Sequence, residues 1–94
     1  MQFVSTRGQA PVLGFSDAVL AGLASDGGLY VPQVWPQVSP AEIAAFAGKP
    51  YADVAYAIIS RFTGDEIAPQ TLRAIVDEAY AAFRHPSVTP LAEI

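Results

Sequence analysis

The segment Asp26-Gly27-Gly28-Leu29-Tyr30-Val31-Pro32 constrains the fold of this chain more than any other stretch. Two adjacent glycines allow a sharp reversal, because glycine adopts backbone angles that strain other residues. The apolar residues after them have strand propensity, and Pro32 ends the extended run. A helix is predicted just before the bend, from Ser16 to Ala24. The sequence therefore predicts a helix, a tight turn and a short strand in succession.

Short extended segments form the predicted sheet. The partner expected for Leu29-Tyr30-Val31 is Phe3-Val4-Ser5, which is too short to be stable without a neighbouring strand. Gln9 to Gly14 is predicted to be a connector between this first strand and the first helix. The later segment from Gln33 to Val38 is expected to be irregular, with the Trp35 indole packed as an anchor across the core.

Two of the predicted helices begin at capping signals. Ser16 is the expected N-cap of the first helix. Ser39 is the expected N-cap of the second, because Pro40 stands at the first helical position and Glu42 completes a capping box. Gly48 is expected to end this second helix.

Two further helices follow from apolar periodicity. From Tyr51 to Gly64, apolar residues recur every three or four positions, which is the pattern of an amphipathic helix. The last helix is predicted to start at Pro69 and to end before Pro86, because a proline disfavours helical geometry in the residue ahead of it. Arg73 and Asp77 on this helix have the spacing of an ion pair.

Length and composition agree with one small domain. The 94 residues are enough for a modest core, and 52% of them are hydrophobic whereas only 15% are charged. Such thin surface charge indicates that something else covers part of the surface. The predicted fold class is α+β, mostly helical, with about four helices and a few short strands in a small sheet.

Composition excludes several classes of partner and site. The net charge is −4 and the five basic residues are scattered, so neither nucleic acid nor a membrane is an expected partner. With no cysteine and a single histidine, His85, the chain contains no disulfide, thiol nucleophile or Cys/His zinc site. No signal peptide or membrane-spanning run is recognisable, and the cytoplasm is the expected location.

The sequence contains no complete catalytic pattern. Gly48-Lys49 is followed by Pro50 and does not make a phosphate-binding loop. His85 stands just past a predicted helix end, where a role at the helix dipole is favoured over a catalytic triad. The pairs Asp65-Glu66 and Asp77-Glu78 are assigned to a solvated face. No residue is therefore assigned as catalytic, cofactor-binding or metal-binding.

Ser5-Thr6-Arg7-Gly8 leaves two interpretations open. A hydroxyl pair beside an arginine at a strand end could bind an anion or a carboxylate. The alternative is structural, with Arg7 capping carbonyl groups or pairing with an acid. The residues alone favour the structural role.

Several motifs together carry a resemblance to a known family. They are Ser5-Thr6-Arg7-Gly8, Phe15-Ser16-Asp17-Ala18, the bend at 26–32, Tyr80-Ala81-Ala82-Phe83-Arg84 and Val88-Thr89-Pro90-Leu91. In this order and spacing, the chain resembles the N-terminal domain of threonine synthase. The resemblance covers nearly the whole chain. It implies that residues 1–87 are the N-terminal domain of a threonine synthase, which is a fold-type-II pyridoxal phosphate enzyme. Residues 88–94 would then be the start of its catalytic domain, which is truncated here.

The resemblance implies a function only for a longer protein. Enzymes of this family use pyridoxal phosphate to convert O-phosphohomoserine and water to threonine and phosphate, and their cofactor lysine lies in a Phe-Lys-Asp context further along. Lys49, the single lysine here, lies between Gly48 and Pro50 and does not match. We therefore expect this fragment alone neither to bind the cofactor nor to be catalytic.

The expected role of the domain is to pack on the catalytic domains of its own chain and help cover the active-site cleft. The residues expected to face that cleft are Ser5, Thr6, Arg7, Asp26 and Gly27. Two alternatives stay open: the N-terminal domain of a threonine-synthase-like phospho-lyase, and an independent helical protein-interaction module.

Overall fold

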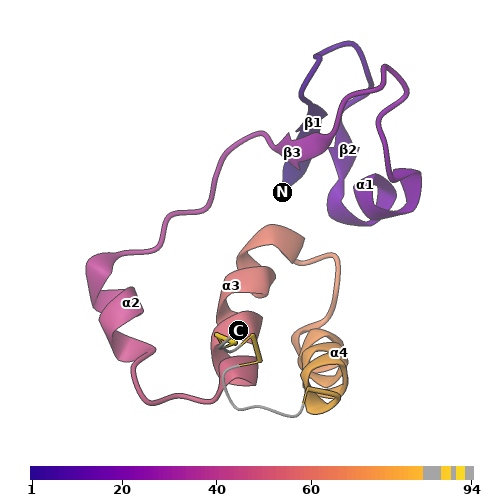
Figure 1. Ribbon diagram of the computed structural model, residues 1–94. Coiled ribbons are helices and arrows are strands. Elements are labelled where there is room, and N and C mark those ends of the chain that lie inside the picture. The colour runs from indigo at the N-terminus through magenta and orange to yellow at the C-terminus, as the bar shows by residue number, and fades with distance from the viewer. Residues whose placement is uncertain (84–87, 90, 93–94) are drawn as a thin grey trace. The chain divides into compact units, whose positions relative to one another are not determined.

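A computed structural model describes residues 1–83, 88–89 and 91–92. The chain divides into two compact units, each described by itself (Figure 1): unit 1 is Met1–Gln37 with Arg61–Ile67, and unit 2 is Val38–Ser60 with Ala68–Ile94. The predictions for His85 and Pro86 lie outside the described residues. Among the described helices, none combines the length and the apolar character that crossing a bilayer requires.

Unit 1 contains a three-stranded antiparallel sheet, in the strand order β2-β1-β3. The strands are β1 (Gln2–Ser5), β2 (Leu13–Gly14) and β3 (Tyr30–Pro32). Val4 pairs with Val31 and Ser5 with Tyr30, which confirms the predicted pairing across the bend. The connector prediction for Gln9 to Gly14 was wrong at its end, because its last two residues form β2.

Pro32 lies inside β3 instead of after it. It aligns with Phe3 of β1, and the next residue, Gln33, donates its backbone N–H to Gln2 O at 2.9 Å. A proline cannot donate to a sheet ladder, so it is tolerated only where its nitrogen is not needed, as on an edge strand. The strand order places β3 at such an edge.

Helix α1 (Phe15–Ala21) is shorter than predicted and is capped differently. Ser16 was expected as the N-cap, but Gly14 holds that position and makes no side-chain cap. The Glu66 carboxylate accepts hydrogen bonds from Phe15 N at 2.5 Å and Ser16 N at 3.2 Å. Glu66 is exposed, as its assignment to a solvated face predicts, but the sequence did not predict that this acid supplies the cap that α1 lacks locally.

The core of unit 1 is small. Phe3, Ser5, Ala18 and Ala24 are buried, and the Phe3 ring lies 5.9 Å from that of Phe15, centroid to centroid. Trp35 was predicted to be buried as an anchor, and this was wrong. Its side chain is 58% exposed, and it contacts Phe62 edge-on with ring centroids 6.3 Å apart.

Unit 2 is helical and contains α2 (Pro40–Ala45), α4 (Pro69–Ala81) and most of α3 (Tyr51–Thr63). Ser39 accepts a hydrogen bond from Glu42 N at 3.1 Å, which confirms the predicted N-cap. The helix ends at Ala45, and Gly48 closes the following turn with φ 77°. The four helices and one small sheet of the described residues confirm the predicted α+β class.

Contacts between α3 and α4 hold unit 2 together. Leu72 and Val76 are buried, and the rings of Tyr51 and Tyr80 lie 5.0 Å apart. Arg73 donates to Asp53 of α3 at 2.5 Å and, as predicted, to Asp77 of its own helix at 3.0 Å. Hydrogen bonds to these two carboxylates, led by Asp53, raise the pKa of Arg73 above its usual range.

Candidate functional site

The glycine bend is a closed turn joined to the end of β1. Gly27 N donates to Ala24 O, and Ala24 N donates to Gly28 O, each at 2.9 Å. Gly27 has φ 83°, in the left-handed region that favours glycine. The predicted reversal is thus confirmed, with two backbone hydrogen bonds across it.

The Asp26 carboxylate is the centre of this region. One oxygen accepts from Ser5 Oγ at 2.7 Å and from Gly28 N at 2.9 Å. The other accepts from Ser5 Oγ at 2.9 Å and from Gln9 N at 2.8 Å. These hydrogen bonds, led by that from Ser5, lower the pKa of Asp26 below its ordinary value of 3.8. The carboxylate is therefore ionised at neutral pH, and its charge holds three chain segments together.

Arg7 extends over the bend from the turn that follows β1. Its Nη1 donates to the backbone oxygen of Asp26 at 3.0 Å. A Cβ on Gly27 would lie 2.7 Å from this same nitrogen, so a larger residue would displace the guanidinium, and the φ of 83° independently favours glycine. The structural prediction that Arg7 caps a carbonyl group is confirmed.

Thr6 makes the third connection. Its backbone N–H donates to Leu29 O at 2.8 Å, and its Oγ1 accepts from Leu29 N at 3.0 Å. A Cβ on Gly28 would lie 2.9 Å from Thr6 Oγ1 and would collide with Ser5 Oγ. Gly28 is therefore needed for the close approach of the bend to the end of β1.

The structure brings together all five residues that the sequence expected at a cleft, and we call this group the bend cluster: Ser5, Thr6, Arg7, Asp26 and Gly27. Sequence reasoning missed two members of the network, Gln9 and Gly28, which donate backbone N–H groups to Asp26. The bond from Gly28 could have been found, because an aspartate commonly accepts from the residue two positions later in a turn.

The chemistry available within the bend cluster is binding, not proton transfer. Ser5 is buried, and the base at its hydroxyl is the Asp26 carboxylate, whose lowered pKa makes it a poor proton acceptor for activating a nucleophile. Arg7 is exposed, and among the described residues its guanidinium donates only to the Asp26 carbonyl. Its other N–H groups can therefore donate to a carboxylate or a phosphate.

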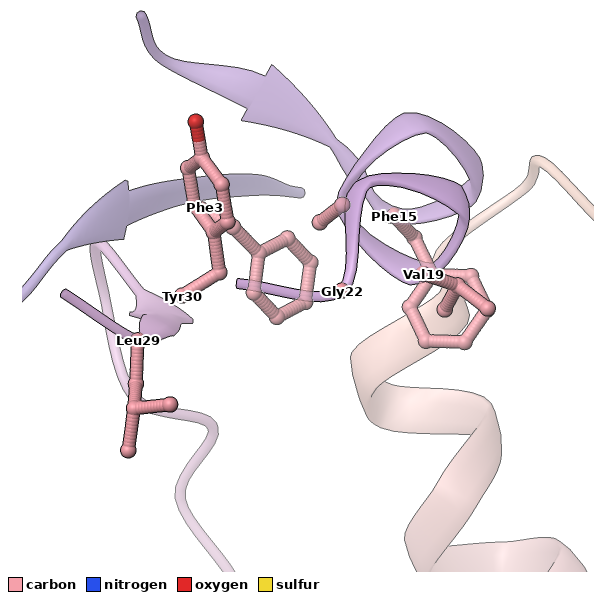
Figure 2. Close-up of a pocket in the computed structure, with 7 residues that line it drawn as sticks. Phe3, Phe15, Val19, Gly22, Leu29 and Tyr30 are labelled. Carbon is pink, nitrogen blue, oxygen red and sulfur yellow. The ribbon is translucent and has the colours of Figure 1, made fainter. Parts of the chain in front are cut away.

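Each unit contains an apolar cavity. One, of about 320 Å³, is in unit 1; Figure 2 shows Phe15 and Val19 of α1 together with Phe3 and Tyr30 of the strands around it. The other, of about 250 Å³, is in unit 2 and is lined by residues of α3 and α4. Lys49 is exposed between α2 and α3 and lines neither cavity. The described residues contain no group of three or more acidic or histidine side chains that could hold a metal.

Comparison with known proteins points to one family. A family model described as threonine synthase N terminus matches residues 2–80. Threonine synthase of Pseudomonas aeruginosa is 46% identical over 94 residues, a match that covers 100% of this chain and 20% of that protein. Threonine synthase-like 2 of Homo sapiens is 34% identical over 95 residues and is covered to the same 20%.

Solved structures agree. The PLP-bound threonine synthase from Brucella melitensis matches 99% of this chain and 20% of its own, with a TM-score of 0.91 and 56% identity. The yeast threonine synthase matches 95% of this chain and 18% of its own, with a TM-score of 0.85 and 34% identity. The chain thus spans about a fifth of the length of these relatives. The chain belongs to the threonine synthase N-terminal family.

Proposed function

We propose that this chain is the N-terminal domain of a threonine synthase that converts O-phospho-L-homoserine and water to L-threonine and phosphate. The observation that carries the proposal is the match over residues 2–80 to a model of this one domain, together with 46% identity to a threonine synthase along the whole chain. In this reaction a carbon–oxygen bond to phosphate breaks and the hydroxyl of water is added to the neighbouring carbon. We place the whole enzyme in the cytoplasm.

We assign the cofactor to the part of the relatives that this chain does not span. One similar protein of solved structure is described as PLP-bound. The residues present here do not fit the cofactor, because a covalent PLP site needs an enclosed lysine and Lys49 lies on an exposed turn next to Pro50. We therefore derive no catalytic step for the chain itself and propose that the fragment alone is inactive.

We propose that the bend cluster faces the active-site cleft of the whole enzyme, with Arg7 making the contact. Support comes from the exposed guanidinium, whose position is set by the Asp26 carbonyl and by the space above Gly27. The substrate carries both a phosphate and a carboxylate, and arginine binds either through paired N–H donors. In this role Ser5 and Asp26 hold the loop that carries Arg7, while the domain helps to exclude water from the cleft.

A threonine-synthase-like phospho-lyase is a second candidate, favoured by the 34% identity to threonine synthase-like 2 of Homo sapiens over the whole chain. The test is to supply the full-length protein with pyridoxal phosphate and O-phosphohomoserine and to measure both products. Threonine synthase activity gives threonine and phosphate in equal amounts. Phosphate without threonine supports the phospho-lyase, and a protein that releases neither product contradicts both.

The independent interaction module predicts a different result. Such a module would be a compact monomer without a catalytic partner in its own polypeptide. We expect instead a continuation of the reading frame that contains a Phe-Lys-Asp sequence, and a stop codon directly after Ile94 would contradict the enzyme proposal.

A further inference from the structure

Helix α1 turns the Phe15 ring toward Phe3 but leaves two of its large apolar side chains exposed. Of its seven residues, only Ala18 is buried. Val19 is 62% exposed and Leu20 is 84% exposed, and Leu23, just after the helix, is 66% exposed. Large apolar side chains normally lie on the buried face of a helix. The exposed face of α1 therefore has the composition expected of a face that another part of a protein covers.

These side chains form part of a larger apolar surface. Val19 lines the cavity of about 320 Å³ together with Leu29, which is 57% exposed and leaves the glycine bend. We call Val19, Leu20, Leu23 and Leu29 the α1 surface. Isolated exposed leucines need no explanation, but four exposed apolar side chains, two of which line an apolar hollow, mark a contact surface.

The scarcity of charged residues around α1 indicates what kind of partner could cover it. Between Arg7 and Asp26 the sequence contains one charged residue, Asp17. Transient interfaces keep a polar character close to that of ordinary surface, whereas permanent interfaces resemble a section through a domain core. The α1 surface has the composition of a permanent interface. A highly charged partner, such as a nucleic acid, has no complementary group there.

The relatives supply a permanent partner. This chain covers 20% of a threonine synthase of known structure that is 56% identical to it, so about four fifths of that polypeptide lies beyond the match. The rest of the same polypeptide stays at a high effective concentration beside this domain. We propose that the α1 surface is the face by which this domain docks on the rest of its own polypeptide, an inference that depends on the proposed function and specifies its contact surface.

The helix α4 offers a matched control. Ile75 is also an apolar residue on a helix and is 52% exposed, but it stands among Arg73, Asp77 and Glu78. Charged neighbours keep a helix face hydrated, so Ile75 is expected to stay in contact with water in the whole protein. Leu20 is the more exposed of the two in this domain, so slower labelling at position 20 than at position 75 requires that the α1 surface becomes covered.

The test is thiol labelling in the full-length protein. Leu20→Cys and Ile75→Cys are each treated with a maleimide under native conditions and in urea, and labelling at each position is followed by peptide mass spectrometry. We expect native labelling of Leu20→Cys to be at least about tenfold slower than in urea, while Ile75→Cys changes by less than about threefold. Equal native rates at the two positions overturn the proposal.

Two further measurements distinguish docking within one polypeptide from contact between two copies of it. Protection of Leu20→Cys that disappears on dilution means that a second copy covers the α1 surface, and it overturns the proposal. If Leu20→Cys does not fold, Leu23→Cys and hydrogen exchange of the wild-type peptide 15–23 give the same readout. Labelling is independent of activity, so a protein that protects Leu20→Cys but makes no threonine contradicts the proposed function and leaves the docking surface intact.

Discussion

Ser5 Oγ lies 2.7 Å and 2.9 Å from the two oxygens of the Asp26 carboxylate, which joins β1 to a glycine bend 21 residues later. We assign no catalytic role to either residue of this contact. Its effect is to fix the loop between them, and with it Arg7, whose backbone N–H donates to the same Ser5 oxygen at 3.2 Å. The contact is structural, and any functional effect of Ser5 would act through the position of Arg7.

Replacing Ser5 with alanine should destabilise the domain by about 1–3 kcal/mol, because it leaves a buried site without its donor to a charged acceptor. Ser25→Ala is the matched control, since Ser25 is exposed and has no side-chain hydrogen bond among the described residues. We expect the control to stay within about 0.5 kcal/mol of wild type in urea unfolding. Equal effects of the two substitutions would show that the Ser5 hydroxyl does not hold the bend.

Replacing Gly28 with alanine should cost more than replacing Gly8. The new Cβ at Gly28 would lie 2.9 Å from Thr6 Oγ1 and 3.0 Å from Asp26 Oδ1, and overpacking of this kind costs about 1–3 kcal/mol. Gly8 has φ 73° and no atom within 4 Å of its added Cβ, so alanine there carries only the conformational cost, about 1 kcal/mol. Urea unfolding of both variants checks the order, and a Gly28→Ala variant as stable as wild type contradicts the close packing of the bend.

Acid should weaken unit 1 through two carboxylates. The hydrogen bond from Ser5 is the main cause that lowers the pKa of Asp26 below its ordinary value of 3.8. The hydrogen bond from the Phe15 N–H is the main cause that lowers the pKa of Glu66 below its ordinary value of 4.5. Because the pKa is lower in the folded state, the stabilisation is complete above the ordinary values and is lost as the pH falls through the folded pKa. Both side chains contact water, so the effect is modest.

The measurement is the urea midpoint from about pH 6 down to about pH 3. Glu66→Gln should lower the midpoint at the upper end and flatten its fall with acid. Asp65→Asn removes the neighbouring acid, whose side chain has no hydrogen bond among the described residues, and should leave the profile unchanged. Parallel acid profiles for wild type and Glu66→Gln would contradict a role for Glu66 at the start of α1.

Local sequence signals predicted much of this fold. The Ser39 cap and the start of α4 at Pro69 each depend on residues close together in sequence. The pairing of β1 with β3 depends on the Gly27-Gly28 bend, which turns the chain back toward β1. The bend cluster spans more of the chain, because β2 and α1 lie between Ser5 and Asp26, and the pairing of β1 with β3 brings the two residues together.

The errors concern contacts over longer distances. Glu66 reaches the start of α1 from 50 residues away, and no pattern near Ser16 indicates that its cap comes from elsewhere. Trp35 was expected in the core on grounds of size, but a domain whose largest apolar side chains are often exposed does not bury a tryptophan by default.

The most direct test of the account is the Arg7→Ala substitution in the full-length enzyme, with kcat/KM for O-phosphohomoserine and the urea midpoint both measured. We predict a loss of at least about tenfold in kcat/KM with a small change in midpoint, as expected when a charge-assisted contact to the substrate is removed. Arg73→Ala is the control, because Arg73 joins α3 and α4 and should affect stability alone. Unchanged kcat/KM in Arg7→Ala, or a loss explained by unfolding, would contradict the placement of the bend cluster at the cleft.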